Sequence, residues 1–174
     1  MSSIRLIHGS CVEQEVDVIV NAANRDLQAG AGICGAIFSK AGYRELQEAC
    51  DKYKTPLKDG EVAITPAFNI KNANYIIHAV GPDFYSTPNA FKELFDAYYN
   101  SMKLLIEKKL HSIAFPLISS GIFGGRLENP PQESAKQCLR AYKKIIEDYK
   151  DYNIDVILCA YTEAEYVSAK VEIN

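Results

Sequence analysis

The fold is decided by the stretch VDVIVNAAN, which runs from Val16 to Asn24. It begins with a nearly continuous run of β-branched residues and ends in small and amide side chains. Continuous apolar runs are typical of strands that are covered on both faces. The stretch therefore predicts a buried strand of an α/β protein, with polar groups at the point where the strand ends.

Further apolar runs alternate with helical patterns along the rest of the chain. Strands are predicted within residues 4–10, 16–24, 60–68, 74–82, 112–118 and 155–161. Helices are predicted within residues 33–41, 43–54, 89–110, 130–150 and 163–170, where the second either continues the first or restarts it. Alternation of this kind predicts an α/β sandwich, in which a largely parallel sheet has helices on both faces.

Length and composition indicate an ordinary globular protein. The chain has 174 residues, of which 48% are hydrophobic and 24% charged, and we expect a single domain over residues 1–174. The formal net charge of −3 argues against broad binding to nucleic acids or acidic membranes, which need a basic face. No run is long enough to span a bilayer, and no apolar leader follows Met1. We expect a cytoplasmic monomer, or a domain of a larger intracellular chain.

Cysteines and histidines show no metal-ligand spacing. The odd number of cysteines predicts free thiols rather than disulfides in a chain of this kind. The three histidines are scattered, so we expect no metal site. These residues are Cys11, Cys34, Cys50, Cys138, Cys159, His8, His78 and His111.

Two glycine-rich loops, at residues 29–35 and 119–124, follow predicted strands. Ligands of open α/β sheets bind beyond the carboxyl ends of the strands. Consecutive N–H groups in such a loop can surround an anion, and a helix N-terminus favours phosphate. Ser119 and Ser120 offer additional hydroxyl donors. Each loop alone fits a tight turn equally well, but two at one edge, beside the AVGP loop at 79–82, indicate a diphosphate held from both sides.

Four more side chains lie at or near these strand ends. Asn21 and Asn24 carry donors and acceptors suited to a pair of ribose hydroxyls, and a structural role is the better reading for Asn21. Tyr161 can stack on a base or pack in the core. Phe123 lies inside a glycine loop, where it has few core neighbours.

Together these motifs resemble the macrodomain family over nearly the whole chain. The motifs are DVIVNAAN, AGAGICGAIFSKAG, GEVAIT, YIIHAVGP and FPLISSGIFGG, in the family's order. The resemblance implies a three-layer α/β/α sandwich around a six-stranded, mixed and mostly parallel sheet. It also implies that the chain binds ADP-ribose and needs no cofactor. Family members either act on ADP-ribosyl groups, including Appr-1''-p processing and the deacetylation of O-acetyl-ADP-ribose, or only bind the modification.

The resemblance also implies a role for each part of the site. The 119–124 loop is similar to the diphosphate loop of the family, residues 30–34 to the loop that faces it, and Asn24 to the asparagine at the distal ribose. The first strand end and Tyr161 correspond to the adenine end. The expected ligand-binding residues are Ser10, Cys11, Asn24, Gly30, Gly32, Ile33, Cys34, Ser119, Ser120, Gly121, Ile122, Phe123, Gly124 and Tyr161, with catalysis expected at Asn24 and Gly32.

Two departures from the family pattern affect function. Ser10 stands where most members have an Asp that accepts from the adenine amino group, and a hydroxyl is the weaker acceptor. Cys34 and Phe38 stand where the hydrolytic branch has an Asp and a His, so no carboxylate base is available there. Some viral members that resemble hydrolases also lack this Asp. In them the substrate is thought to assist, with the diphosphate and loop backbone holding a water while an Asn orients the ribose.

Three functions are therefore considered. The first is hydrolysis of ADP-ribosyl esters, either on Asp and Glu side chains of a modified protein or in O-acetyl-ADP-ribose. The second is a reader that binds ADP-ribosylated proteins without chemistry. The third, a general nucleotide-binding or RNA-binding domain, is opposed by the acidic charge balance.

Overall fold

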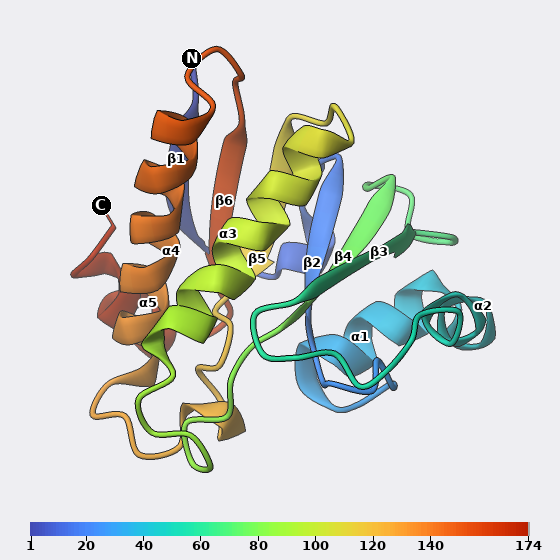
Figure 1. The fold of residues 1–174 in the computed structure, drawn as a ribbon, viewed down its shortest axis with the longest axis horizontal. Coiled ribbons are helices and arrows are strands. Elements are labelled where there is room, and N and C mark those ends of the chain that lie inside the picture. The colour runs from blue at the N-terminus through green and yellow to red at the C-terminus, as the bar shows by residue number, and fades with distance from the viewer. Residues whose placement is uncertain (174) are drawn as a thin grey trace.

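A computed structural model describes residues 1–173 and shows one sheet enclosed between two layers of helices (Figure 1). The order of strands in the sheet is β1-β6-β5-β2-β4-β3. Neighbouring strands are parallel, except that β3 runs antiparallel to β4. The six strands are β1 (Ser3–His8), β2 (Val18–Ala23), β3 (Val62–Pro66), β4 (Tyr75–Val80), β5 (Ser112–Pro116) and β6 (Asp155–Ala160). This six-stranded, mixed and mostly parallel sheet is the one that the family resemblance implies.

The helices divide between the two faces of the sheet. In Figure 1, α3, α4 and α5 cover one face, while α1 and α2 lie on the other. They are α1 (Gly32–Ala41), α2 (Tyr43–Cys50), α3 (Phe91–Glu107), α4 (Pro130–Asp148) and α5 (Glu163–Lys170), with short 3-10 turns η1 (Cys11–Glu13) and η2 (Ile122–Gly124). The three-layer α/β/α arrangement is thereby confirmed.

Strand β2 is buried on both faces, as its continuous apolar run predicts. Val18 and Val20 pack into the cluster under α3 and α4, and Ile19 and Ala23 pack into the cluster under α1 and α2. Successive side chains of a strand point to opposite faces, so both sides of this strand must be apolar. The continuous apolar run of this strand is therefore explained by the helices that pack on each face of the sheet.

Helix ends follow local backbone chemistry. Gly42 has φ +110° and separates α1 from α2, so the second helix restarts. It ends at Cys50, earlier than the predicted limit at residue 54. At the start of α4, Oδ1 of Asn129 accepts from the N–H of Gln132 at 3.3 Å, with Pro130 at the first helical position.

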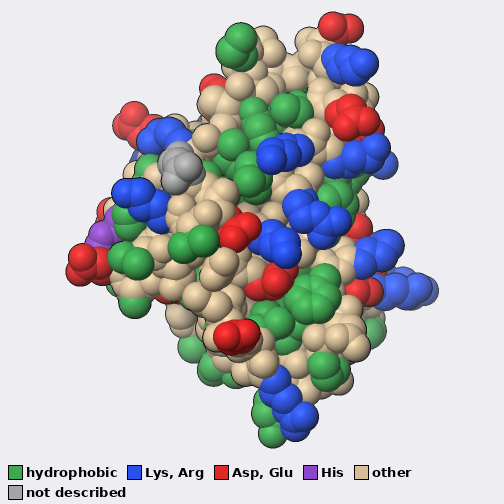
Figure 2. All heavy atoms as spheres, turned by 90° about the vertical axis from the view of Figure 1, so that its left-hand side faces the viewer, with side chains coloured by type: hydrophobic (Ala, Val, Ile, Leu, Met, Phe, Trp, Pro, Cys, Tyr) green, Lys and Arg blue, Asp and Glu red, His purple; other side chains and the backbone are tan. Residues whose placement is uncertain are grey.

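The surface carries mixed charges on the face drawn in Figure 2, where Lys and Arg side chains lie among Asp and Glu. Lys144 and Asp148 of α4, for example, form an ion pair at 3.1 Å. Within residues 1–173, none of the helices has the length and apolar character needed to cross a membrane.

Strands β2 and β5 pair over only part of their length. β2 pairs with β4 at six positions, but with β5 at two, Val18 with Ile113 and Ile19 with Ala114. Beyond Ile19 the two strands part toward their carboxyl ends. The thiol of buried Cys11, in η1, donates to the Val20 carbonyl at 3.8 Å, which gives that carbonyl a partner in place of the missing strand.

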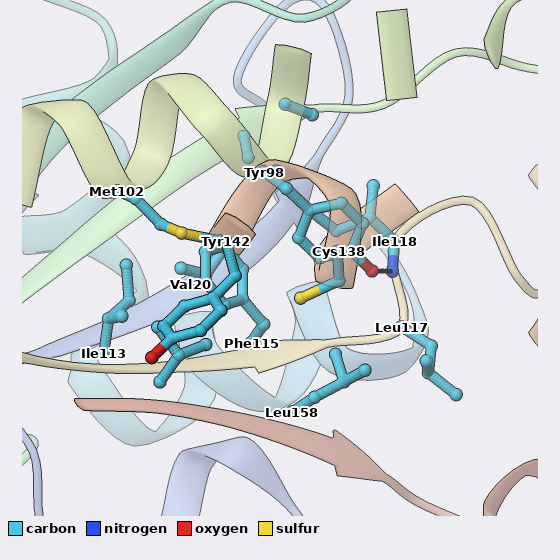
Figure 3. Packing of buried hydrophobic residues seen from close by; sticks show 14 of the residues in the cluster. Val20, Tyr98, Met102, Ile113, Phe115, Leu117, Ile118, Cys138, Tyr142 and Leu158 are labelled. Carbon is cyan, nitrogen blue, oxygen red and sulfur yellow. Dashed lines mark hydrogen bonds between the residues drawn. The ribbon is translucent and has the colours of Figure 1, made fainter. Parts of the chain in front are cut away.

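Buried polar side chains fix the chain where it leaves β5. The hydroxyl of Tyr98 in α3 accepts from the N–H of Ile118 at 2.9 Å, the dashed line in Figure 3. The same hydroxyl lies 2.6 Å from Oγ of Ser134 in α4, and Ser134 donates to the Ile118 carbonyl at 2.5 Å. Two helices therefore hold both backbone groups of the residue that precedes the 119–124 loop.

We predict that Tyr98→Phe lowers the free energy of unfolding by about 1–3 kcal/mol, because it leaves the buried N–H of Ile118 without its acceptor. Tyr142→Phe is the matched control, since within residues 1–173 the Tyr142 hydroxyl has no hydrogen-bond partner. It should change stability by no more than about 0.5 kcal/mol. Urea unfolding of both variants tests this, and equal losses would contradict the proposed anchor.

Candidate functional site

A cleft of about 880 Å³ lies at the sheet edge where β2 and β5 part. Its walls come from the loops that follow β1, β2, β5 and β6 and from the first turns of α1. Pockets of about 300–1,000 Å³ hold small-molecule ligands. All the predicted ligand-binding residues line this cleft except Gly124.

Gly124 lies behind the loop instead of on the cleft wall. A Cβ at this position would meet the Pro130 side chain at 2.7 Å. Its N–H donates to the Gly121 carbonyl at 2.9 Å, which closes the turn. The structure therefore places Gly124 off the cleft wall, where close packing against Pro130 at the start of α4 requires a glycine, and its contact with a ligand stays a prediction.

The serine hydroxyls of the 119–124 loop hold the loop in place. Ser119 donates to the Pro82 carbonyl and Ser120 to the Leu117 carbonyl, both at 2.7 Å. The AVGP loop supports this arrangement, because a Cβ on Gly81 would come within 2.5 Å of Ser119 Oγ. The expected hydroxyl donors are thus already used, and the AVGP loop braces the site without lining it.

Two rows of backbone N–H groups line the cleft. In the described part of the chain, the N–H groups of residues 120–123 donate to no protein acceptor. Across the cleft, α1 begins at Gly32 without a side-chain cap, so its first N–H groups are also free. The positive end of the helix dipole lies at the same place. Together these donors form a site for an anion with two negative groups.

Asn24 lies at the end of β2 with half of its hydrogen-bonding capacity in use. Its Nδ2 donates to the Gln28 carbonyl at 2.8 Å, and its Oδ1 accepts from the Gln28 N–H at 2.9 Å. An asparagine amide has two donor hydrogens and two acceptor lone pairs. One donor and one acceptor therefore remain, which is the pattern that a pair of adjacent hydroxyls requires.

The other end of the cleft carries side chains suited to a base. Tyr161 lines the cleft and is 73% exposed. Ser10 Oγ accepts from the Val12 N–H at 3.3 Å, so part of its acceptor capacity is already used. The charged residues Glu13, Lys40 and Glu165 also line the cleft and were not predicted. The sequence does contain a signal for Glu165. It is the last residue of a Thr-x-x-Glu capping box that begins at Thr162, directly after Tyr161.

Among residues 1–173, the only carboxylates on the cleft wall are those of Glu13 and Glu165. Cys34 is 6% exposed, and burial raises the pKa of its thiol, so this group is protonated at neutral pH. Asn21 is buried, and its Nδ2 lies 3.0 Å from Nδ1 of His78. Burial lowers the pKa of His78 to about 4, so the imidazole is neutral and structural. Among the described residues no group of His, Cys, Asp and Glu could hold a metal ion.

The comparisons with known proteins agree with this geometry. A family model described as Macro domain matches residues 20–138. An uncharacterized protein of Fusobacterium nucleatum is 42% identical over 169 residues, with 96% of this chain and 92% of that protein covered. The macrodomain of Oceanobacillus iheyensis, solved with ADP, superposes with a TM-score of 0.88 at 32% identity, covering 98% of this chain and 90% of that one.

A longer relative carries an enzyme name. ADP-ribose glycohydrolase MACROD1 of Mus musculus is 37% identical over 164 residues. The alignment covers 93% of this chain and 49% of that protein, so this chain spans about half the length of that relative.

We predict that Gly32→Ala lowers the free energy of unfolding by about 1–2 kcal/mol, because φ is +60° there and an alanine must adopt the left-handed conformation. No atom lies within 4 Å of the added Cβ, so a clash does not contribute. Gly30→Ala is the control, since its Cβ would make only ordinary contacts, such as 3.8 Å to Cys34 Sγ. Denaturant unfolding should show that loss for position 32 alone, and an equal loss at both positions would contradict the backbone argument.

Proposed function

This chain belongs to the Macro domain family, and on that basis we propose that it binds ADP-ribose in the cleft and hydrolyses ADP-ribosyl esters. The observation that carries the proposal is the pair of free N–H rows, from residues 120–123 and from the start of α1, on the walls of one cleft. The substrates are ADP-ribose esters of Asp and Glu side chains and O-acetyl-ADP-ribose.

The diphosphate is the part of the ligand that best matches these donors. Charge-assisted hydrogen bonds from N–H groups to phosphate oxygens are shorter and stronger than neutral ones. Two rows contact the two phosphates from different sides. Adenine extends from there toward Tyr161, and the distal ribose toward Asn24, whose remaining donor and acceptor suit its hydroxyls.

Catalysis is assigned to the substrate together with the loop backbone. The thiol of Cys34 is protonated, and the carboxylates on the cleft wall, Glu13 and Glu165, belong to η1 and to the first turn of α5. A phosphate oxygen therefore takes a proton from a water held near Gly32, and the water oxygen attacks the carbonyl carbon of the ester. The bond from this carbon to the ribose oxygen then breaks, the carboxylic acid is released, and the ribose oxygen takes back the proton from the phosphate. Asn24 holds the ribose so that the ester faces the attacking water. The N–H rows stabilise the negative charge on the diphosphate.

The second candidate function is a reader without chemistry. The observation that favours it is the neutral, buried thiol of Cys34, which stands at the position where the hydrolytic branch of the family has its carboxylate. Both candidates need ADP-ribose to bind, and they differ only in turnover.

We predict that Asn24→Ala lowers the turnover of an ADP-ribosyl ester by at least about tenfold and weakens ADP-ribose binding by less than about fivefold, since one side chain orients the ribose while the diphosphate holds the ligand. Calorimetry with ADP-ribose measures binding, and release of free ADP-ribose from an auto-modified acceptor protein measures turnover. Asn100→Ala is the matched control, because Asn100 ties a loop through the Gly60 carbonyl, away from the cleft.

The results separate the candidates. Binding with release by the wild type, lost in Asn24→Ala and kept in Asn100→Ala, supports the hydrolase. Tight binding with no release after long incubation at high protein concentration assigns the reader instead. A wild type that does not bind ADP-ribose at all would reject both.

A further inference from the structure

The Gln28 carbonyl oxygen accepts hydrogen bonds from two side chains of the site. Asn24 Nδ2 donates to it at 2.8 Å, and the thiol of Cys34 donates to the same oxygen with Sγ at 3.6 Å. The distance for sulfur is longer because the atom is larger. A carbonyl has two lone pairs, so both bonds can exist together.

The peptides on both sides of Gln28 are held by another side chain. Gln47 of α2 donates from Nε2 to the Leu27 carbonyl at 3.1 Å and accepts at Oε1 from the Ala29 N–H at 3.0 Å. The Gln28 carbonyl and the Ala29 N–H belong to one planar peptide unit, so Gln47 holds this unit from its N–H side. Asn24 and Cys34 hold the same unit from its carbonyl side.

The thiol lies among other groups of the site. Cys34 is in the first turn of α1, and Asn21 and the Gly30 backbone lie close to its sulfur. Asn21 is 1% exposed, its Nδ2 is used by His78, and its Oδ1 is a buried atom with no partner among residues 1–173. The thiol of Cys34 therefore lies between an incompletely paired amide under the cleft and the carbonyl that accepts from Asn24.

We propose that Cys34 is a positioning residue for Asn24, acting through their shared acceptor, the Gln28 carbonyl oxygen. With the thiol in place the carbonyl is fixed from two directions, and the amide of Asn24 keeps its free donor and acceptor turned to the distal ribose. Without the thiol, Asn24 alone holds this peptide unit from its carbonyl side, so the unit can tilt about its contact with Gln47 and the Asn24 amide shifts with it. This inference rests on the proposed function, because the ribose it concerns is that of ADP-ribose.

The free N–H groups of residues 120–123 do not depend on this arrangement, and those at the start of α1 are backbone groups that a change of the Cys34 side chain retains. The 119–124 loop is anchored by Tyr98, Ser134 and Gly81, and none of these contacts involves Cys34. Loss of the thiol should therefore affect the distal ribose and leave the grip on the diphosphate intact. ADP, which has the diphosphate and lacks the distal ribose, provides the comparison.

The experiment compares wild type, Cys34→Ala and Cys34→Ser, with Cys138→Ala as the control for loss of a buried thiol in the other helix layer. Calorimetry gives the affinities for ADP-ribose and ADP, and ester release gives kcat and KM. Because Cys34 acts through Asn24, its loss should weaken ADP-ribose binding by about threefold in Cys34→Ala, no more than the loss of Asn24 itself, while ADP binding stays within about 1.5-fold. If the wild type is active, kcat should fall by about fivefold, again no more than in Asn24→Ala, with KM within about twofold, as for a group that acts in the transition state.

Two further readouts keep the test specific. Cys34→Ser retains a donor and should recover most of the ADP-ribose affinity, whereas a purely structural loss would not be rescued in this way. In the free protein, the NMR signals of the Asn24 side-chain amide should shift or broaden in Cys34→Ala and not in Cys138→Ala. This readout needs neither ligand nor turnover.

The outcomes for the two proposals are distinct. A wild type that binds ADP-ribose without releasing it rejects hydrolysis, while the ratio of ADP-ribose to ADP affinity still tests Cys34. An unchanged ratio together with an unchanged Asn24 amide signal in Cys34→Ala overturns the positioning role. So does a Cys34→Ser variant that behaves like Cys34→Ala.

Discussion

The site depends on the incomplete pairing of two parallel strands. β2 and β5 exchange hydrogen bonds only as far as Ile19 and Ala114, and beyond this point they separate. The separation opens the sheet edge between their loops, and the 3-10 turn at Cys11 supplies the partner that the Val20 carbonyl would otherwise lack. Ligands of open α/β sheets bind where neighbouring connections diverge. The position of the cleft is therefore a consequence of the sheet itself.

Hydrogen bonds from neighbouring elements hold the loops of the cleft walls rigidly. This explains how these loops can present several unpaired backbone N–H groups. Residue 118 is held by α3 and α4, Ser119 is tied to Pro82, and the loop after β2 is pinned by Gln47 and Asn24. These bonds fix the N–H groups before any ligand arrives, so little ordering is needed when an anion binds. Electrostatic groups that are already in place are also the ones that can stabilise charge during a reaction.

The sequence predicts the layers and most of the cleft, because apolar periodicity and glycine placement follow local rules. Prediction from sequence fails where the role of a side chain depends on hydrogen-bond partners or neighbours that lie near it only in the folded chain. Ser119 and Ser120 look like ligand donors in the sequence, but in the structure their hydroxyls donate to the carbonyls of Pro82 and Leu117. Gly124 looks like its neighbours, yet Pro130 lies against it. Cys34 and Asn24 donate to the same backbone carbonyl, that of Gln28. Every residue has such a carbonyl, so the residue types do not predict this contact.

The most direct test of the account is backbone amide hydrogen exchange, measured with and without saturating ADP-ribose. We expect strong protection at two separate places, the N–H groups of residues 120–123 and those of Gly32 to Cys34, because both rows donate to the diphosphate. Protection of one row only, or of neither row while the ligand is bound, would contradict the claim that a diphosphate is held between them.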